Sequence, residues 1–255
     1  MDTFLEPNPD ALLTAKPFVG RAIVVQVDPL AAESSTLVED IVFMRRLGVR
    51  PIVVHDVDQR ACGSRLVGLI NRIGGDALAL DGTSASTLVV STGSDGRNVV
   101  RSVNVQLLSL LLEQGYIPVF SSEGALFSGA VAPLDAADAA QVLATSIHAI
   151  RLLYPSGTGG IPAGSDGIIH ELTSSEALTL AAAGTLSASQ SHQLTAAAMG
   201  VRAGVDAAQL LDLRVAHAAL VELLTAQHLG TQVVSHVVLS SALRRLPGSS
   251  SPTPR

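Results

Sequence analysis

The feature that most constrains this chain is a regular alternation of short apolar runs with longer amphipathic segments. The run AIVVQV (residues 22–27) is followed by an amphipathic stretch over residues 35–48, and then by a second apolar run that ends at His55. Uninterrupted apolar runs are typical of parallel strands that helices cover on both faces. Because the alternation continues along the chain, it predicts an α/β protein, a three-layer αβα sandwich with a mainly parallel open sheet.

The predicted elements account for most of the sequence. Helices are expected at about residues 9–18, 35–48 (capped by Ser35 or Thr36), 64–73, 104–114, 135–148, 174–183, 189–199 and 215–226, and strands at 22–27, 49–55, 77–80, 116–122, 149–155, 207–211 and 232–239. Two β-rich pieces between residues 83 and 103 flank Asp95-Gly96, a typical hairpin turn. We expect one domain over residues 1–245 and a disordered, low-complexity tail over residues 246–255.

Composition excludes several classes of protein. The 255 residues are 47% hydrophobic, which suffices for a sizeable core, but no run of about 18 uncharged apolar residues suggests a membrane span. A net charge of −6 with 3% aromatic residues argues against a nucleic-acid partner. One cysteine, Cys62, excludes an internal disulfide. Since the first residues lack the features of a signal peptide, we expect a cytoplasmic protein.

The basic side chains are distributed unevenly between the two residue types. Fifteen are arginines and one is a lysine, Lys16. Chemistry that needs a lysine amine therefore has a single residue to use. Lys16 precedes the first predicted strand and is expected to have a surface role.

Six phrases in the chain resemble, in order and spacing, those of acetylglutamate kinases of the amino-acid kinase family. They are RAIVVQV with LVEDIVFMRRLGVRPIVVH, RLVGLINRIGGDALAL, LLSLLLEQGYIPVFSSEG, HELTSSEALTLAAAGTLS and LLDLRVAHAALVELLTAQHLGTQVV. The resemblance implies an amino-acid kinase or carbamate kinase-like fold with an open, eight-stranded, mainly parallel sheet. It also implies an acceptor lobe over about residues 13–132, an ATP lobe over about residues 133–240, and phosphoryl transfer at the carboxyl ends of the strands between them.

Several positions depart from the groups that this resemblance implies. Phosphoryl transfer to a carboxylate depends on cations and backbone amides that neutralise charge. The lysine that the family carries at the end of the first strand is Gln26 here, and the glycines after it are Asp28 and Pro29. Pro29 has no N–H to offer a phosphate. The lysine expected in a late helix is Gln193.

The acceptor side departs as well. Where the family has a glycine turn after the second strand, His55 is followed by Asp56-Val57-Asp58. Only ten residues lie between His55 and Leu66, too few for the helix and hairpin that the resemblance implies there. His55 and the acids Asp28, Asp56 and Asp58 could form a site for a cation or an amine at the sheet edge, although solvated loop acids are more common.

Two residues could align with the catalytic aspartate of the family. The family phrase places Asp135 at an asparagine position and Ala137 at the catalytic aspartate, whereas a slip of one residue would place Asp138 there. The histidines show no helical pairing with an acid, so spacing predicts no metal site.

We therefore expect a catalytically impaired acetylglutamate kinase-like protein, linked to arginine biosynthesis, with a regulatory or scaffolding role and no cofactor. Its expected partners are further copies of itself, or a catalytic acetylglutamate kinase or synthase. Two alternatives stay open: an active ATP- and Mg²⁺-dependent N-acetyl-L-glutamate 5-phosphotransferase with a rearranged site, and an arginine-binding sensor. Gln227 stands where relatives carry an acid, which weakens the sensor alternative.

Overall fold

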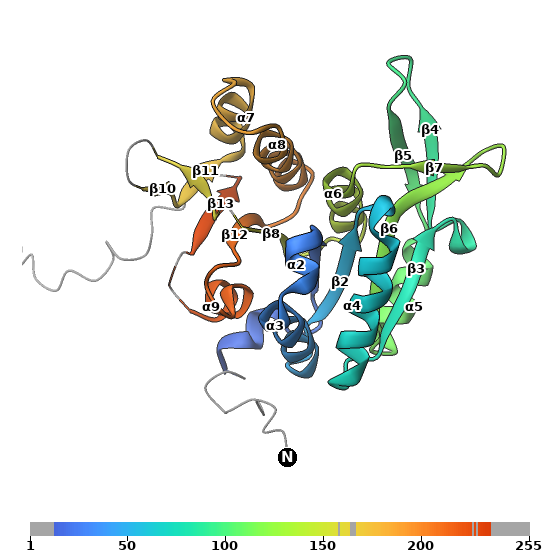
Figure 1. Ribbon diagram of the computed structural model, residues 1–255, viewed down its shortest axis with the longest axis horizontal. Helices are drawn as coiled ribbons and strands as arrows, with labels where there is room; N and C mark the ends of the chain where they lie inside the picture. Colours follow the sequence, from blue (N-terminus) through green and yellow to red (C-terminus); the bar gives the residue numbers. More distant parts are fainter. Residues whose placement is uncertain (1–12, 158, 164–166, 226, 228, 236–255) are drawn as a thin grey trace, which may run out of the picture.

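A large open sheet forms the centre of the molecule (Figure 1). This computed structural model describes residues 13–157, 159–163, 167–225, 227 and 229–235. Eight strands follow one another across the sheet in the order β3 (Ala77–Gly82), β6 (Ile117–Leu126), β2 (Arg50–His55), β1 (Ala22–Val27), β8 (Arg151–Ser156), β12 (Ala207–Asp212), β13 (Gly230–Val234) and β11 (Glu171–Thr173). The first six are parallel, and β13 is antiparallel to β12.

Three more strands extend the sheet from β6 and project from the body of the molecule (Figure 1). They are β4 (Leu88–Thr92), β5 (Asn98–Val103) and β7 (Val131–Pro133). β4 and β5 form the antiparallel hairpin that the Asp95-Gly96 turn predicts. A separate small hairpin pairs β9 (Ile161–Pro162) with β10 (Ile168–Ile169).

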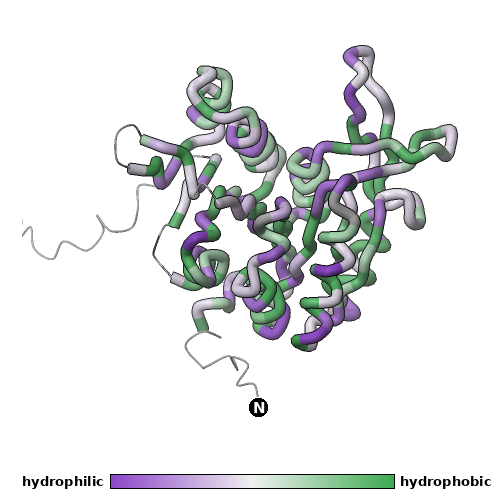
Figure 2. The backbone as a smooth tube through the Cα atoms, viewed as in Figure 1, coloured by the Kyte–Doolittle hydropathy of each residue, from purple (hydrophilic) through white to green (hydrophobic). Residues whose placement is uncertain are grey.

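Helices cover both faces of the sheet, which confirms the predicted three-layer architecture. One face packs against α2 (Pro29–Glu33), α3 (Ser35–Arg46), α4 (Arg60–Arg72) and α9 (Ala218–Leu224), and the other against α5 (Val105–Glu113), α6 (Ala136–Ser146), α7 (Ser174–Ala182) and α8 (Ala188–Arg202). Strand β1 packs against both helix layers, because Ile23 and Val25 belong to one hydrophobic cluster and Val24 belongs to the other. Burying each of these side chains contributes about 1.5–3 kcal/mol. The apolar strands lie inside the molecule (Figure 2).

Most predicted elements are confirmed, and the differences have local causes. The cap of α3 is Ser34, not Ser35 or Thr36, because its side chain accepts the Leu37 N–H at 3.2 Å. The short elements α2, β7 and β11 were not predicted. Helix α9 begins at Ala218, three residues later than predicted, and η2 (Val57–Gln59) and η3 (Ser84–Ser86) are short 3₁₀ turns.

The two ends of the chain can be compared only in part. Of the helix predicted at about residues 9–18, the described portion is helical at residues 13–15 and continues as the 3₁₀ turn η1 (Lys16–Phe18). The tail over residues 246–255 and the end of the strand predicted at 232–239 lie outside the described residues. None of the helices in the described part of the chain has the length and apolar character that a membrane span needs.

A buried carboxylate links the first half of the chain to helix α9. Asp40 on α3 is only 1% exposed, and the Nδ1–H of His217 donates to its Oδ1 at 2.7 Å. The backbone N–H groups of Ala219 and Leu220 also donate to Asp40. Asp40 therefore caps the start of α9 from another helix, next to His217, whose backbone is left-handed (φ 57°).

This capping carboxylate should make stability depend on pH. Burial raises the pKa of Asp40 to about 6, although the hydrogen bond and charge of His217 lower it. The folded protein thus binds a proton at Asp40 more tightly than the unfolded chain, whose aspartate pKa is about 3.9. As the pH falls from about 7 to about 5, the free energy of unfolding of the wild type should rise relative to that of Asp40→Asn. Urea unfolding across this range measures the difference, and a difference that does not change with pH would contradict this assignment.

Candidate functional site

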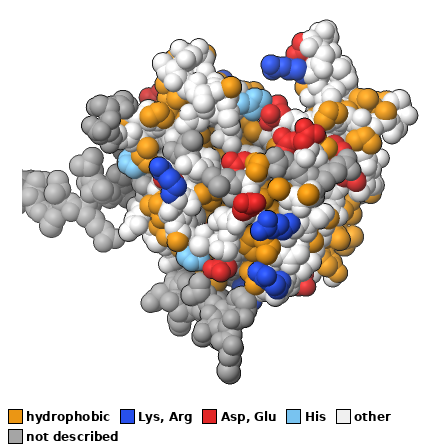
Figure 3. Space-filling model, viewed as in Figure 1, with side chains coloured by type: hydrophobic (Ala, Val, Ile, Leu, Met, Phe, Trp, Pro, Cys, Tyr) orange, Lys and Arg blue, Asp and Glu red, His pale blue; other side chains and the backbone are white. Residues whose placement is uncertain are grey.

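A cavity of about 410 Å³ opens at the carboxyl ends of β1 and β2, where helices α6 and α8 begin. This is the edge of a parallel sheet at which α/β proteins usually bind ligands. Acidic side chains gather across the middle of the molecule on the face shown in Figure 3. The described residues that line the cavity include three aspartates and one histidine, and none is a lysine or an arginine.

The structure brings together most of the residues that the sequence singles out. Gln26, Asp28, Asp56, Asp135 and Gln193 all line this cavity. They come from two strand ends and two helix starts that are far apart in the chain. The residues at which the resemblance implies phosphoryl transfer therefore lie around one cavity.

The two glutamines at the expected lysine positions contact each other. Gln26 is two residues beyond Val24 on the sheet face that α6 and α8 cover, and the Nε2–H of Gln193 on α8 donates to Gln26 Oε1 at 3.1 Å. Both side chains are buried, with 6% and 8% exposed. A buried amide pair of this kind satisfies polar groups without any net charge.

Asp28 and Pro29 build a local helix start. Asp28 Oδ1 accepts the Ala31 N–H at 2.7 Å and caps the five-residue helix α2, whose first residue is Pro29. One oxygen of this carboxylate is thus committed to the cap. The carboxylate still adds negative charge to the cavity wall.

The turn after β2 is formed in a similar way. Asp56 Oδ1 accepts the Asp58 N–H at 3.0 Å, and the Val57 N–H donates to Ser122 Oγ at 3.1 Å. Asp58 is exposed and does not line the cavity. Between β2 and α4 the chain, described throughout, forms only the 3₁₀ turn η2.

His55 lies apart from these acids. Its Nδ1–H donates to the Asp56 carbonyl oxygen at 2.8 Å, and its ring packs against Gly63, where an added Cβ would lie 2.1 Å from Nε2. It lines a second cavity, of about 200 Å³, together with Asp81, Ser121 and other residues of β3, β6 and α4. The predicted grouping of His55 with Asp28, Asp56 and Asp58 is therefore not assembled around one cavity.

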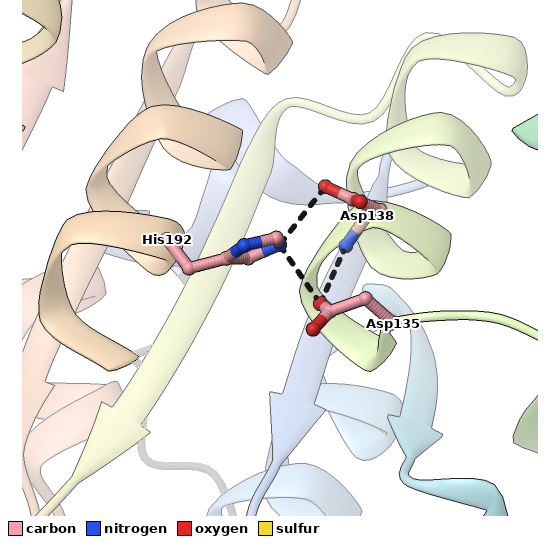
Figure 4. Close-up of side chains that lie close together, drawn as sticks. All are labelled: Asp135, Asp138 and His192. Carbon is pink, nitrogen blue, oxygen red and sulfur yellow. Dashed lines mark hydrogen bonds and ion pairs between the residues drawn. The ribbon is translucent and has the colours of Figure 1, made fainter. Parts of the chain in front are cut away.

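A cluster of two acids and a histidine lies at the rim of the main cavity (Figure 4). His192 Nε2 on α8 lies 3.1 Å from Asp135 Oδ1 and 3.2 Å from Asp138 Oδ1. Asp135 Oδ1 also caps α6 by accepting the N–H of Ala137 at 2.8 Å. Burial raises the pKa of Asp138, His192 lowers it, the charge of Asp135 raises it, and the charge of Arg97 lowers it. Sequence reasoning missed His192, because 54 residues separate it from Asp138 and no local spacing signals the contact.

The residues that the resemblance aligns with the family's catalytic phrase lie at the start of α6, beside this cluster. Asp135 begins α6, Ala137 is buried, and Asp138 is one helical residue further on. The buried Tyr154 hydroxyl donates to the Ala137 carbonyl oxygen at 3.2 Å and holds this turn against β8. Asp135 and Asp138 therefore both lie at the rim, in the turn to which the resemblance assigns the catalytic phrase.

Comparison with known proteins agrees with the resemblance found in the sequence. No family model matches the chain. Acetylglutamate kinases from Acaryochloris marina and Synechocystis sp. are each 29% identical to it, over 89% of this chain and 96% and 92% of theirs. The chain is thus similar to acetylglutamate kinases over most of its length.

Solved structures support the same fold for this acetylglutamate kinase-like chain. N-acetylglutamate synthase from Neisseria gonorrhoeae, complexed with coenzyme A and N-acetyl-glutamate, superposes with a TM-score of 0.79 at 20% identity and covers 92% of this chain. The chain spans 64% of the length of that synthase. Carbamate kinase from Giardia lamblia, bound to AMP-PNP, superposes with a TM-score of 0.64 at 11% identity over 85% of the chain. The predicted amino-acid kinase and carbamate kinase-like fold is confirmed.

The amide pair should be energetically coupled. Replacing Gln26 or Gln193 alone with the similarly shaped Met leaves a buried amide without its partner and should cost about 1–3 kcal/mol of unfolding free energy. Replacing both should cost less than the sum of the single changes, because no buried amide then remains without its hydrogen-bond partner. Urea unfolding of the three variants measures this coupling. Strictly additive losses would mean that the hydrogen bond does not form in solution.

Proposed function

We propose that this chain does not transfer phosphoryl groups and instead has a regulatory or scaffolding role in arginine biosynthesis. The observation that supports this most directly is the buried hydrogen bond between Gln26 and Gln193, at the positions where the resemblance implies two lysines. The cavity thus holds a neutral, buried pair where the resemblance implies two cations.

Charge explains why this substitution matters. Transfer of a γ-phosphoryl group onto a carboxylate brings two anions together, so catalysis depends on donors and cations that stabilise the developing charge. Loss of one such donor costs about 10²–10³ in rate in other enzymes. Two amides that bond to each other supply no positive charge, and the loss should be larger still.

The rest of the cavity wall adds to the effect. Asp28, Asp56 and Asp135 line the cavity, and no described lining residue offers a compensating Lys or Arg. A triphosphate entering it would face three carboxylates, and Pro29 has no N–H to donate to it. The residues present therefore do not fit ATP with Mg²⁺ as an acetylglutamate kinase would hold them, and we derive no catalytic step through the nucleotide.

Similarity over most of the chain and a shared fold support a regulatory role. Its similarity to acetylglutamate kinases extends over most of its length, and its fold matches that of an N-acetylglutamate synthase whose structure was also solved with L-arginine. A retained fold with altered charges suits a subunit that pairs with its own copies, or with a catalytic acetylglutamate kinase or synthase.

A phosphotransferase assay tests both halves of the proposal. With MgATP and N-acetyl-L-glutamate, the chain alone should show no turnover, whereas the acetylglutamate kinase of Acaryochloris marina serves as the positive control. Turnover at about 1 s⁻¹ or faster, the lower end of ordinary enzyme rates, would show an active kinase with a rearranged site. When the chain is mixed with a catalytic acetylglutamate kinase from the organism that encodes the chain, the rate of that kinase should change. An unchanged rate at a saturating concentration of the chain would contradict a regulatory role.

Restoring the lysines should restore anion binding. In the double variant Gln26→Lys/Gln193→Lys, two buried ammonium groups repel each other, so the unfolding midpoint should fall at low salt and rise again with inorganic phosphate or ATP. The matched Gln26→Met/Gln193→Met variant and the wild type should show no such rise. Thermal unfolding with and without the anions measures the effect. An equal rise in the wild type would mean that the amide pair does not prevent anion binding.

A further inference from the structure

The cluster at the cavity rim has the composition and spacing of a metal site. Asp135 and Asp138 come from the start of α6, and His192 comes from α8 (Figure 4). Their potential ligand atoms all lie within 4.8 Å of one another. One imidazole nitrogen thus faces two carboxylate oxygens from a different element of the fold.

Two of the three separations between the ligand atoms are close to those of tetrahedral coordination. Zinc binds imidazole nitrogen and carboxylate oxygen at about 2.0–2.2 Å, so two ligand atoms on its tetrahedron lie about 3.3–3.5 Å apart. His192 Nε2 lies 3.1 Å and 3.2 Å from the two aspartate oxygens. Small movements of partly exposed side chains would admit an ion between them.

Charge balance also favours a divalent ion. The two carboxylates bring two negative charges to the cluster, which a divalent cation would neutralise, and the charge of the Arg97 guanidinium acts on Asp138 as well. Imidazole is a preferred ligand of zinc and similar transition metals, whereas Mg²⁺ and Ca²⁺ prefer oxygen ligands alone. The ligand set therefore selects a transition metal over the hard cations.

The amide pair lies beside this cluster. Asp135 and His192 line the same cavity as Gln26 and Gln193, both of which are more than nine-tenths buried. The hydrogen bond between the amides uses the Gln26 oxygen and one Gln193 hydrogen, and within the described residues no other side chain bonds the Gln26 NH₂ or the Gln193 oxygen. A donor and an acceptor therefore remain for a molecule in the cavity.

We propose that Asp135, Asp138 and His192 bind a divalent transition-metal ion, with zinc the best fit, and that its remaining coordination position faces this cavity. Three protein ligands leave at least one position of a tetrahedral ion open to water or to a small ligand. The buried amides of Gln26 and Gln193 would then hydrogen-bond that molecule. This site is independent of whether the chain transfers phosphoryl groups, because it uses neither nucleotide nor acceptor.

Metal titration of the full chain tests this proposal. After treatment with a chelator and its removal, Zn²⁺ should bind with a stoichiometry of one in calorimetry, and Co²⁺ should produce the visible absorption bands of a tetrahedral site with nitrogen and oxygen ligands. His192→Gln should lower the zinc affinity by more than about tenfold, the smallest loss expected for removing a direct ligand. His170→Gln, which removes an exposed histidine elsewhere, is the matched control and should bind as the wild type does.

A second variant separates metal binding from a merely structural ion pair. Asp138→Asn should reduce zinc affinity and weaken the Co²⁺ bands, while unfolding midpoints without metal confirm that both variants are folded. No saturable binding by the wild type, or equal zinc affinity in the wild type, His192→Gln and Asp138→Asn, would overturn the proposal and leave the cluster as an ion pair between α6 and α8.

Discussion

The hydrogen bond between Gln26 and Gln193 joins the central strand β1 to helix α8 inside the main cavity. It requires the strand to present alternate residues to opposite layers, and it requires α8 to begin beside the strand's carboxyl end. Both conditions follow from the doubly covered parallel sheet. The fold thus brings two distant positions together, and the residue types at those positions determine the chemistry of the cavity.

Neutral amides at the base and carboxylates on the wall give the cavity a negative charge, whereas a phosphate site is positively charged. Where two lysines would attract anions, Asp28, Asp56 and Asp135 attract cations. The same architecture can then hold a cation at its rim, with His192 supplying the nitrogen ligand. The proposed loss of kinase chemistry and the inferred metal site both agree with this distribution of charge.

Much of the fold could be predicted from the sequence, because buried parallel strands require apolar runs. β1 was predicted with its observed bounds, and the caps Asn104 and Asp135 begin α5 and α6 as expected. Helix α2 was missed because five residues carry no helical period. The contact of Gln26 with Gln193 was not predicted, although both residues were identified, since the resemblance implies residue roles and not their distances. His192 carried no signal, because its partners lie on another helix and only tertiary packing brings them close.

Calorimetric titration of MgATP into the wild-type chain tests the central claim most directly, because it measures nucleotide binding without requiring turnover. We predict no saturable heat of binding at MgATP concentrations up to about 1 mM, the upper end of the usual KM values of enzymes. Saturable binding of one MgATP per chain, altered by Asp135→Asn or by Gln193→Met, would contradict this prediction. It would show that the nucleotide enters the cavity despite the amide pair and the aspartates.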